Sequence, residues 1–227
     1  MTEQLDVMAE LDRVGAILLD RHFVYKSEKH GPGYINMDPM FPYAAMVYEF
    51  CGQMMEFFKE EFLRDDDKRI TAVVAPATGG IVLAEFCALY AHQAWGISVM
   101  AVWADKDGKE FVFERDGFIQ HLEGKYVLAV EDLATTGGSV EKVCRLAEAH
   151  SATIAGVALV CNRGGVTEIK MGVPRVESLA EVNFSAVDAD ECELCAAGVP
   201  IIEDIGHPSE FRDAHPDYPG GFVPLHG

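Results

Sequence analysis

The chain has 227 residues, 49% of them hydrophobic, and carries a formal net charge of −19. That length and apolar content can bury one compact core without disulfides, so we predict a single domain over residues 1–227. The strong negative charge argues against a nucleic-acid-binding surface and against binding to anionic membranes, because both need clustered cations. Four of the six cysteines lie in apolar patterns and we find no signal peptide, which favours a reducing, cytoplasmic location.

The N-terminal part predicts a first helix at about residues 3–19, followed by a short hairpin-like pair of strands, HFVY and YINM. Pro42 then opens a long predicted helix through Phe62, whose stripe of Met and Phe side chains is typical of a core or subunit interface.

The middle of the chain, residues 41–170, is predicted to form the core. From Thr71 onward strands and helices alternate, which is typical of an α/β fold with a doubly wound, mainly parallel sheet flanked by helices. The proline-rich stretch 171–227 has no convincing period, so we expect an irregular wrap over the domain.

The run VLAVEDLATTGGS, residues 127–139, is the most informative segment. Its four apolar residues predict a buried strand, and Glu131 and Asp132 follow at the carboxyl end, where open α/β sheets bind ligands. A turn and a predicted helix come next, so backbone N–H groups would face an anion. Because carboxylates accept hydrogen bonds from sugar hydroxyls, the run predicts a ribose-5-phosphate site; an ordinary turn with solvated acids is the alternative. The residues of the predicted turn are Leu133, Ala134, Thr135, Thr136, Gly137, Gly138 and Ser139.

This run resembles the phosphoribosyl-diphosphate (PRPP) signature of type I phosphoribosyltransferases, whereas the motifs GxxxxGK[ST] and GxGxxG are absent from the sequence. The resemblance implies a phosphoribosyltransferase fold with PRPP and a nucleobase as substrates. It also implies Mg²⁺ as cofactor, held mainly by PRPP and water rather than directly by protein side chains.

A second segment, APATGGI at residues 75–81, again follows a predicted buried strand and opens a helix. It resembles the pyrophosphate loop of the family, in the form most similar to orotate phosphoribosyltransferases. The resemblance implies that Thr78, Gly79 and Gly80 supply backbone donors to the diphosphate; a tight turn without a ligand is the alternative.

A third segment, ADKDGKEFVFERDGF at residues 104–118, resembles the flexible catalytic loop of the orotate enzymes. Lys106 matches the lysine at its first end and Arg115 a residue at its second, while Lys109 is either a further cation or part of a solvated hairpin. Such cations would neutralise a departing pyrophosphate while the loop excludes water. In the family this loop crosses to the other subunit's site, which implies a homodimer.

A fourth segment, HFVYKSEKHGPGYIN at residues 22–36, resembles the base-binding hood, so residues 1–40 are predicted to form a helix and a hood. The resemblance implies that Lys26 pairs with the carboxylate of orotate or with the diphosphate, and that Arg163 in CNRGG contacts the pyrimidine. Each could instead be a plain surface cation. Glu28 replaces the family's glycine, so either it faces solvent or the base is not orotate.

Cys192 and Cys195 form a CxxC pair near the end of the chain. We interpret them as structural thiols, because zinc needs two more ligands and His207 and His215 are spaced too widely for a familiar finger. A metal site and a redox or dimer-linked role stay open as alternatives.

Together the resemblances imply an enzyme that converts orotate and PRPP to orotidine 5′-monophosphate and pyrophosphate in pyrimidine biosynthesis. Lys106, Glu131 and Asp132 would be its catalytic residues. The alternatives are a phosphoribosyltransferase for another nucleobase, such as a purine, and a regulator that senses PRPP without turning it over.

Overall fold

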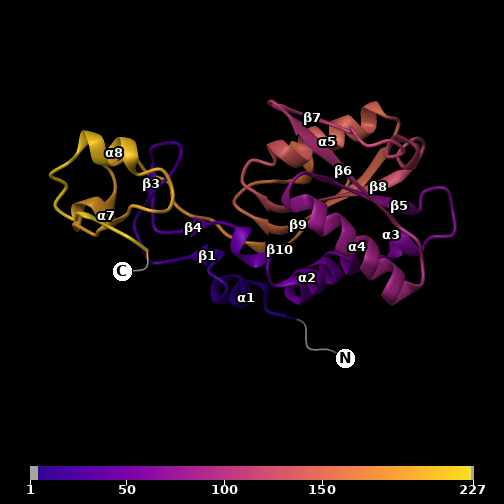
Figure 1. The fold of residues 1–227 in the computed structure, drawn as a ribbon, viewed down its shortest axis with the longest axis horizontal. Helices are drawn as coiled ribbons and strands as arrows, with labels where there is room; N and C mark the ends of the chain where they lie inside the picture. The colour runs from indigo at the N-terminus through magenta and orange to yellow at the C-terminus, as the bar shows by residue number, and fades with distance from the viewer. Residues whose placement is uncertain (1–4, 226–227) are drawn as a thin grey trace. The chain divides into compact units, whose positions relative to one another are not determined.

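The computed structural model describes residues 5–225, and its contacts divide the chain into two compact units (Figure 1). The first unit comprises Met1–Glu10 and Met40–Val182, and the second comprises Leu11–Pro39 and Asn183–Gly227. The predicted core, residues 41–170, therefore falls within the first unit. That all of residues 1–227 act as a single domain stays a prediction.

The first unit is built on a six-stranded sheet with the order β10-β9-β8-β5-β6-β7. Its five larger strands run parallel, and β7 joins the edge as the antiparallel partner of β6. This confirms the predicted α/β fold with a mainly parallel sheet. The strands are β5 (Ile70–Pro76), β6 (Met100–Asp107), β7 (Glu110–Val112), β8 (Tyr126–Ala134), β9 (Thr153–Asn162) and β10 (Val176–Glu181).

Two helices cover opposite faces of this sheet, α4 (Gly79–Trp95) on one face and α5 (Gly138–Ala149) on the other (Figure 1). The chain leaves β5 through α4 to reach β6 on one side, whereas β8 leads through α5 to β9 on the other side. The strand order therefore reverses between β5 and β8, and in such sheets the crevice at the carboxyl end of the reversal is where ligands bind. Fully buried Val127, Val140 and Val143 belong to the core shared by the sheet and α5.

The long helix predicted from Pro42 to Phe62 is two helices, α2 (Ala44–Phe57) and α3 (Lys59–Leu63). Phe58 separates them because its backbone, at φ −113° and ψ 19°, leaves the helical region. The first helix is also shorter than predicted, since α1 covers Val7–Arg13 and the start of the predicted range lies outside the described residues. Two short helical segments complete the unit, η2 (Ile119–His121) and α6 (Glu168–Met171). Across residues 5–225 no helix combines the length and the apolar character that a bilayer crossing requires.

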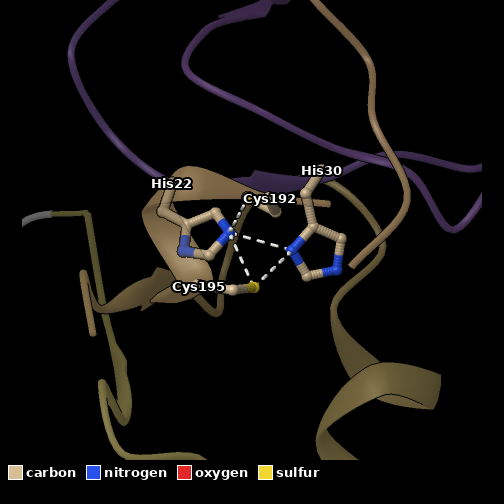
Figure 2. Close-up of side chains that lie close together, drawn as sticks. All are labelled: His22, His30, Cys192 and Cys195. Carbon is tan, nitrogen blue, oxygen red and sulfur yellow. Dashed lines mark hydrogen bonds between the residues drawn. The ribbon is translucent and has the colours of Figure 1, made fainter. Parts of the chain in front are cut away.

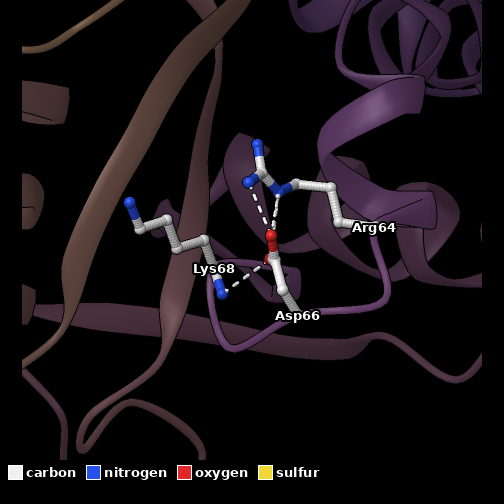
Figure 3. A network of polar contacts seen from close by, with 3 residues as sticks. All are labelled: Arg64, Asp66 and Lys68. Carbon is white, nitrogen blue, oxygen red and sulfur yellow. Dashed lines mark hydrogen bonds and ion pairs between the residues drawn. The ribbon is translucent and has the colours of Figure 1, made fainter.

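The turn that leads into β5 is solvated and held by its own side chains (Figure 3). Arg64 donates to the Asp66 carboxylate through Nη2 at 2.6 Å, and the Lys68 backbone N–H donates to the same carboxylate at 3.0 Å. These hydrogen bonds lower the pKa of Asp66. The turn precedes β5, so it lies at the edge of the sheet opposite the carboxyl ends of the strands, and exposed pairs of this kind add little stability.

The second unit pairs short strands from both ends of the chain. β1 (Ile17–Leu18) pairs with β4 (Tyr34–Ile35), and β2 (Phe23–Val24) pairs with β3 (His30–Gly31). The predicted pairing of HFVY with YINM is therefore wrong, because each of the two segments has another partner. The remaining elements are η1 (Asp38–Met40), α7 (Glu193–Ala196), β11 (Ile201–Ile202), α8 (Ser209–Ala214) and β12 (Phe222–Val223).

One hydrophobic cluster of the second unit has Phe23, Tyr25 and Ile202 as its buried members. Backbone bridges join its two chain segments: His22 pairs with Ile201, and His30 pairs with Val187. The N-terminal and C-terminal segments thus form one small body.

Candidate active site

A cavity of about 520 Å³ opens at the carboxyl ends of β6 and β8 in the first unit. It lies beside the reversal of strand order, and residues from β6, β7, β8 and the start of α5 face it. Of the predicted site residues it gathers both lysines of the loop, Glu131 and all seven residues of the signature turn. The lining residues are Lys106, Gly108, Lys109, Phe111, Glu131, Leu133, Ala134, Thr135, Thr136, Gly137, Gly138, Ser139, Val140 and Lys142.

The signature turn between β8 and α5 presents an open helix start. α5 begins at Gly138, and none of the described side chains caps its N-terminus. Gly137 adopts φ +77°, and a Cβ on it would come within 3.1 Å of Met171 and Val166, so only glycine fits here. Thr135, Thr136 and Ser139 are exposed beside these free N–H groups. The turn can therefore bind an anion such as a sugar phosphate through backbone N–H groups and hydroxyls.

The two acids lie near the carboxyl end of strand β8, as the sequence predicts. The strand continues past them, because pairing with β9 extends as far as Ala134 opposite Asn162. Neighbouring strand residues start toward opposite faces of a sheet, but the two carboxyl groups at this strand end still interact with each other. Glu131 faces the cavity. Asp132 faces the loop after β5, where its Oδ2 lies 2.7 Å from the position that a Cβ on Gly79 would take.

Glu131 is a buried carboxyl, only 8% exposed. Burial raises its pKa well above the usual range, and the adjacent charge of Asp132 raises it further. Asp132 is held differently, because its Oδ1 accepts a hydrogen bond of 2.6 Å from the Leu133 backbone N–H. The site thus offers one carboxyl that holds its proton strongly beside a second, better solvated one.

We expect Glu131→Gln to stabilise the ligand-free protein at neutral pH. A raised folded-state pKa means that the unfolded chain loses this proton first, so wild-type stability falls as pH rises from the unfolded pKa through the folded pKa. Gln stays neutral and avoids that loss, so its melting temperature at pH 8 should exceed the wild-type value by about 3 °C or more. Differential scanning calorimetry from pH 4 to pH 8 measures this. The difference should vanish at the acid end; equal melting temperatures at pH 8 would contradict the argument.

The loop after β5 forms a second open helix start. Thr78 precedes α4, which begins at Gly79, and within the described residues no side chain caps it. The Ala77 N–H donates to the carbonyl of Ala104 at 2.9 Å, which joins the loop to β6. Thr78, Gly79 and Gly80 therefore lie at the same sheet edge and beside Asp132, although they do not line the cavity defined above.

We expect Gly79→Ala to destabilise the protein, because a Cβ there would lie 2.7 Å from Asp132 Oδ2 and 2.8 Å from the Phe41 ring. Overpacking of this kind costs about 1–3 kcal/mol. Gly138→Ala is the matched control, since Gly138 is also in the first turn of a helix and its nearest neighbour would be Thr136 Oγ1 at 3.6 Å. Thermal unfolding without ligand should show a lower melting temperature for Gly79→Ala alone.

The predicted catalytic loop is a hairpin of β6 and β7. Lys106 lies in β6 opposite Phe111, and both side chains line the cavity. Lys109 lies near the tip and also lines it. Arg115 does not: its guanidinium lies over the Trp103 ring at 4.9 Å from the centroid, and its Nε is 4.0 Å from Asp105 Oδ2. Because Trp103 and Asp105 alternate with Lys106 along β6, Arg115 packs on the other face of the strand.

Lys142 is a cavity residue that the sequence analysis missed. Its Nζ donates to the Lys109 carbonyl and, at 3.1 Å, to Glu110 Oε1, so it ties α5 to the hairpin. Lys142 follows Gly138 by four residues, so both lie on the same face of the helix. This spacing alone does not mark Lys142 as a site residue, because a single lysine in a helix is usually solvated.

Arg163 lies at the carboxyl end of β9, next to the signature strand. Its backbone N–H donates to the Ala134 carbonyl at 2.8 Å. The buried Asn162 amide donates to the Val166 carbonyl at 2.9 Å and holds this loop in shape. Lys26 and Glu28 are exposed in the second unit, between β2 and β3. A role for Lys26 in substrate binding stays a prediction.

The sequence and the fold of this chain are similar to those of the same group of known proteins. The model of the phosphoribosyl transferase domain matches residues 51–190. An orotate phosphoribosyltransferase of Thermus thermophilus is 33% identical over 202 residues, which covers 88% of this chain and all of that protein. The corresponding enzyme of Caldicellulosiruptor saccharolyticus is 29% identical and covers 82% of this chain and 88% of its own.

Solved structures show the same fold at lower identity. Orotate phosphoribosyltransferase from Aeropyrum pernix superposes with a TM-score of 0.59 and 22% identity, covering 77% of this chain and 93% of that one. Adenine phosphoribosyltransferase from Saccharomyces cerevisiae gives a TM-score of 0.56 and 21% identity, covering 76% of this chain and 98% of that one. The matched domain, the relatives and the open helix starts at the switch point agree: this chain belongs to the phosphoribosyltransferase family.

Proposed function

We propose that the protein transfers the phosphoribosyl group of PRPP to orotate, giving orotidine 5′-monophosphate and pyrophosphate. One observation carries this: the uncapped start of α5, the Glu131 carboxyl and Lys106 border one cavity beside the switch point of the sheet. The relatives named orotate phosphoribosyltransferase, which match over most of this chain, support the choice of orotate.

Binding of PRPP follows from the two open helix starts. The turn Thr135–Ser139 would hold the 5-phosphate, and the turn Thr78–Gly80 would hold the diphosphate through backbone N–H groups. Glu131 and Asp132 would bind the ribose hydroxyls between them, since β8 places both acids at this sheet edge. Two phosphate sites and a sugar site would thus fix the position of C1.

In the reaction the C1–O bond to pyrophosphate breaks and takes its electron pair to the departing oxygen, while a nitrogen of the base bonds to C1. The ribose gains positive character in between, and the carboxylates lie near that charge. Lys106 and the Thr78–Gly80 N–H groups would stabilise the negative charge on the leaving group. Position and electrostatics suffice, so no protein nucleophile is needed.

Mg²⁺ fits this site by donor chemistry. Carboxyl and hydroxyl oxygens of Glu131, Thr135, Thr136 and Ser139 line the cavity, and among the described residues that line it none carries a thiol or an imidazole. Oxygen donors suit this hard cation, which keeps much of its water shell and would be held mainly by PRPP. When bound, it supplies positive charge to the diphosphate.

Recognition of orotate would use Arg163, and a role for Lys26, which lies in the second unit, stays a separate prediction. A guanidinium suits adjacent carboxylate and carbonyl oxygens, and Arg163 lies beside the signature strand. Glu28, which replaces a glycine of the family pattern, is exposed, which favours the interpretation that it faces solvent.

The test is pyrophosphate release from PRPP and Mg²⁺ with a panel of bases. We expect release with orotate and none with adenine, guanine or hypoxanthine. Release with a purine alone would show that the purine, and not orotate, is the substrate. If no base causes release while PRPP still raises the melting temperature, the protein is a regulator that binds PRPP and not an enzyme.

We also propose a homodimer in which the β6–β7 hairpin completes the partner's site. A variant without Lys106 and a variant without Asp132 should then each be inactive yet regain activity when mixed. Random exchange makes half of the dimers hybrid, each with one intact site, so about a quarter of wild-type activity should return. Subunit exchange followed by the pyrophosphate assay measures this. Mixtures that stay inactive although hybrids form would place the hairpin in its own subunit's site.

A further inference from the structure

Four metal-binding side chains meet inside the second unit: His22, His30, Cys192 and Cys195 (Figure 2). Their ligand atoms all lie within 4.8 Å of one another. We infer that this cluster is a structural zinc site of the Cys2His2 type. It is separate from the candidate active site, whose residues belong to the first unit.

The distances between the ligand atoms match a tetrahedral zinc ion. Sulfur-to-nitrogen distances are 3.3 Å from Cys195 Sγ to His30 Nδ1, 3.7 Å from Cys195 Sγ to His22 Nε2, and 3.6 Å from Cys192 Sγ to His22 Nε2. Zinc bonds of about 2.3 Å to sulfur and about 2.0–2.1 Å to nitrogen imply sulfur-to-nitrogen edges of about 3.5 Å. The two histidine nitrogens are 2.9 Å apart, so the ion needs them to separate by a few tenths of an ångström.

The surroundings suit a closed site. Both histidines are fully buried and Cys192 is 4% exposed. The Nδ1 of His22 lies 2.9 Å from the Val199 carbonyl, and a proton donated there leaves Nε2 free to bind a metal. Two thiols and two imidazoles with no position left for water are typical of structural zinc, and soft sulfur ligands disfavour Mg²⁺ and Ca²⁺.

The orientation of His30 also supports a metal site. Its Nδ1 faces the cluster, while its Nε2 is buried and has no hydrogen-bond partner among residues 5–225. The Phe211 ring packs edge-on against it at 4.5 Å between centroids. A metal ion in the cluster would give this buried imidazole its main polar interaction, through Nδ1.

The chain arrangement explains what such an ion would do. The histidines come from the N-terminal segment and the cysteines from the start of α7, 170 residues later for the pair His22 and Cys192. A metal held by residues of both segments would cross-link them and so stabilise the folded unit. The proposal takes up the metal alternative for the two cysteines, with His22 and His30 rather than His207 and His215 as the further ligands.

An access route exists beside Cys195. This half-buried residue borders an open pocket of about 540 Å³ that Phe211, His215 and Tyr218 also line. A metal can therefore enter, and a chelator can remove it, without unfolding the first unit.

The first experiment measures zinc in the purified full chain by plasma mass spectrometry and native mass spectrometry. We expect about one zinc per chain for the wild type and a loss of at least about tenfold for Cys195→Ser and His30→Gln. His207→Gln, an exposed histidine of the same unit, and Cys144→Ser, a buried cysteine of the first unit, are matched controls that should keep the metal. Equal zinc in all five proteins would overturn the site.

The second experiment uses only the wild type, so misfolded variants cannot decide the outcome. Chelated protein titrated with Co²⁺ should develop the absorption bands of tetrahedral cobalt bound to thiolates, and Zn²⁺ should displace them. Hydrogen exchange should slow at least about tenfold in residues 11–39 and 183–227 on zinc binding and not in β5, β8 or β9. Absence of the bands, or a chain two hydrogens lighter because Cys192 and Cys195 form a disulfide, would overturn the proposal. None of these measurements needs PRPP, so they are independent of the proposed activity.

Discussion

Asp132→Asn should lower kcat/KM for PRPP by at least about 100-fold, a loss of about 3 kcal/mol of transition-state stabilisation. The change keeps the shape of the side chain but removes the charge that would hold the ribose hydroxyls and lie near the developing positive charge. It also replaces one acceptor oxygen by a donor in the narrow space beside Gly79. Steady-state kinetics with orotate measures the effect.

The control for this variant is Asp66→Asn. Asp66 is an exposed aspartate of the same unit and is bound to Arg64 in the turn before β5 (Figure 3). Its replacement should leave kcat/KM within about twofold of the wild type, because nothing reacts at that edge of the sheet. Near-normal kinetics for Asp132→Asn, with a normal melting temperature, would remove Asp132 from the ribose site.

Lys106→Ala should lower kcat by about 100-fold to 1,000-fold and change KM for PRPP far less. Lys106 lies in β6 with its side chain at the cavity that Glu131 also lines. Its charge matters most when pyrophosphate departs, so its loss raises the barrier more than it weakens ground-state binding. Steady-state and single-turnover kinetics separate the two effects.

Lys106→Arg should recover part of the loss, because the charge is kept while the geometry changes. Lys68→Ala is the matched control: Lys68 is an exposed lysine of the same unit, at the turn before β5. An unchanged kcat for Lys106→Ala would exclude the hairpin from the chemical step.

The sequence predicted the sheet and the open turn between β8 and α5 well because both depend on local patterns. The apolar run at 127–130 and the small residues that follow it specify a buried strand and an open turn wherever they occur. The length of β8 was not predictable in this way. It continues through the two acids because β9 offers backbone partners as far as Asn162, and the length of a neighbouring strand cannot be read from the segment itself.

The main failures of the prediction were the contacts between separate segments of the chain. The partners of HFVY and YINM were assigned wrongly because two-residue strands carry too little pattern to specify a partner. The sequence left a metal site at Cys192 and Cys195 open but did not identify further ligands for it, because His22 and His30 lie near the other end of the chain and spacing rules cover only ligands in one short segment. Phe58 interrupts a helix without any glycine or proline to signal it.

The division of the second unit between two segments also determines the order in which the protein can fold during synthesis. Residues 11–39 leave the ribosome first, but their partners begin at Asn183, after the entire sheet has been made. At about 5–20 residues per second the early segment waits for roughly 7–30 seconds, with its histidines away from the cysteines while the first unit can already fold. The second unit can complete its folding only when its C-terminal segment has been made. A shortage of zinc should therefore delay the folding of the second unit and leave the folding of the sheet unchanged.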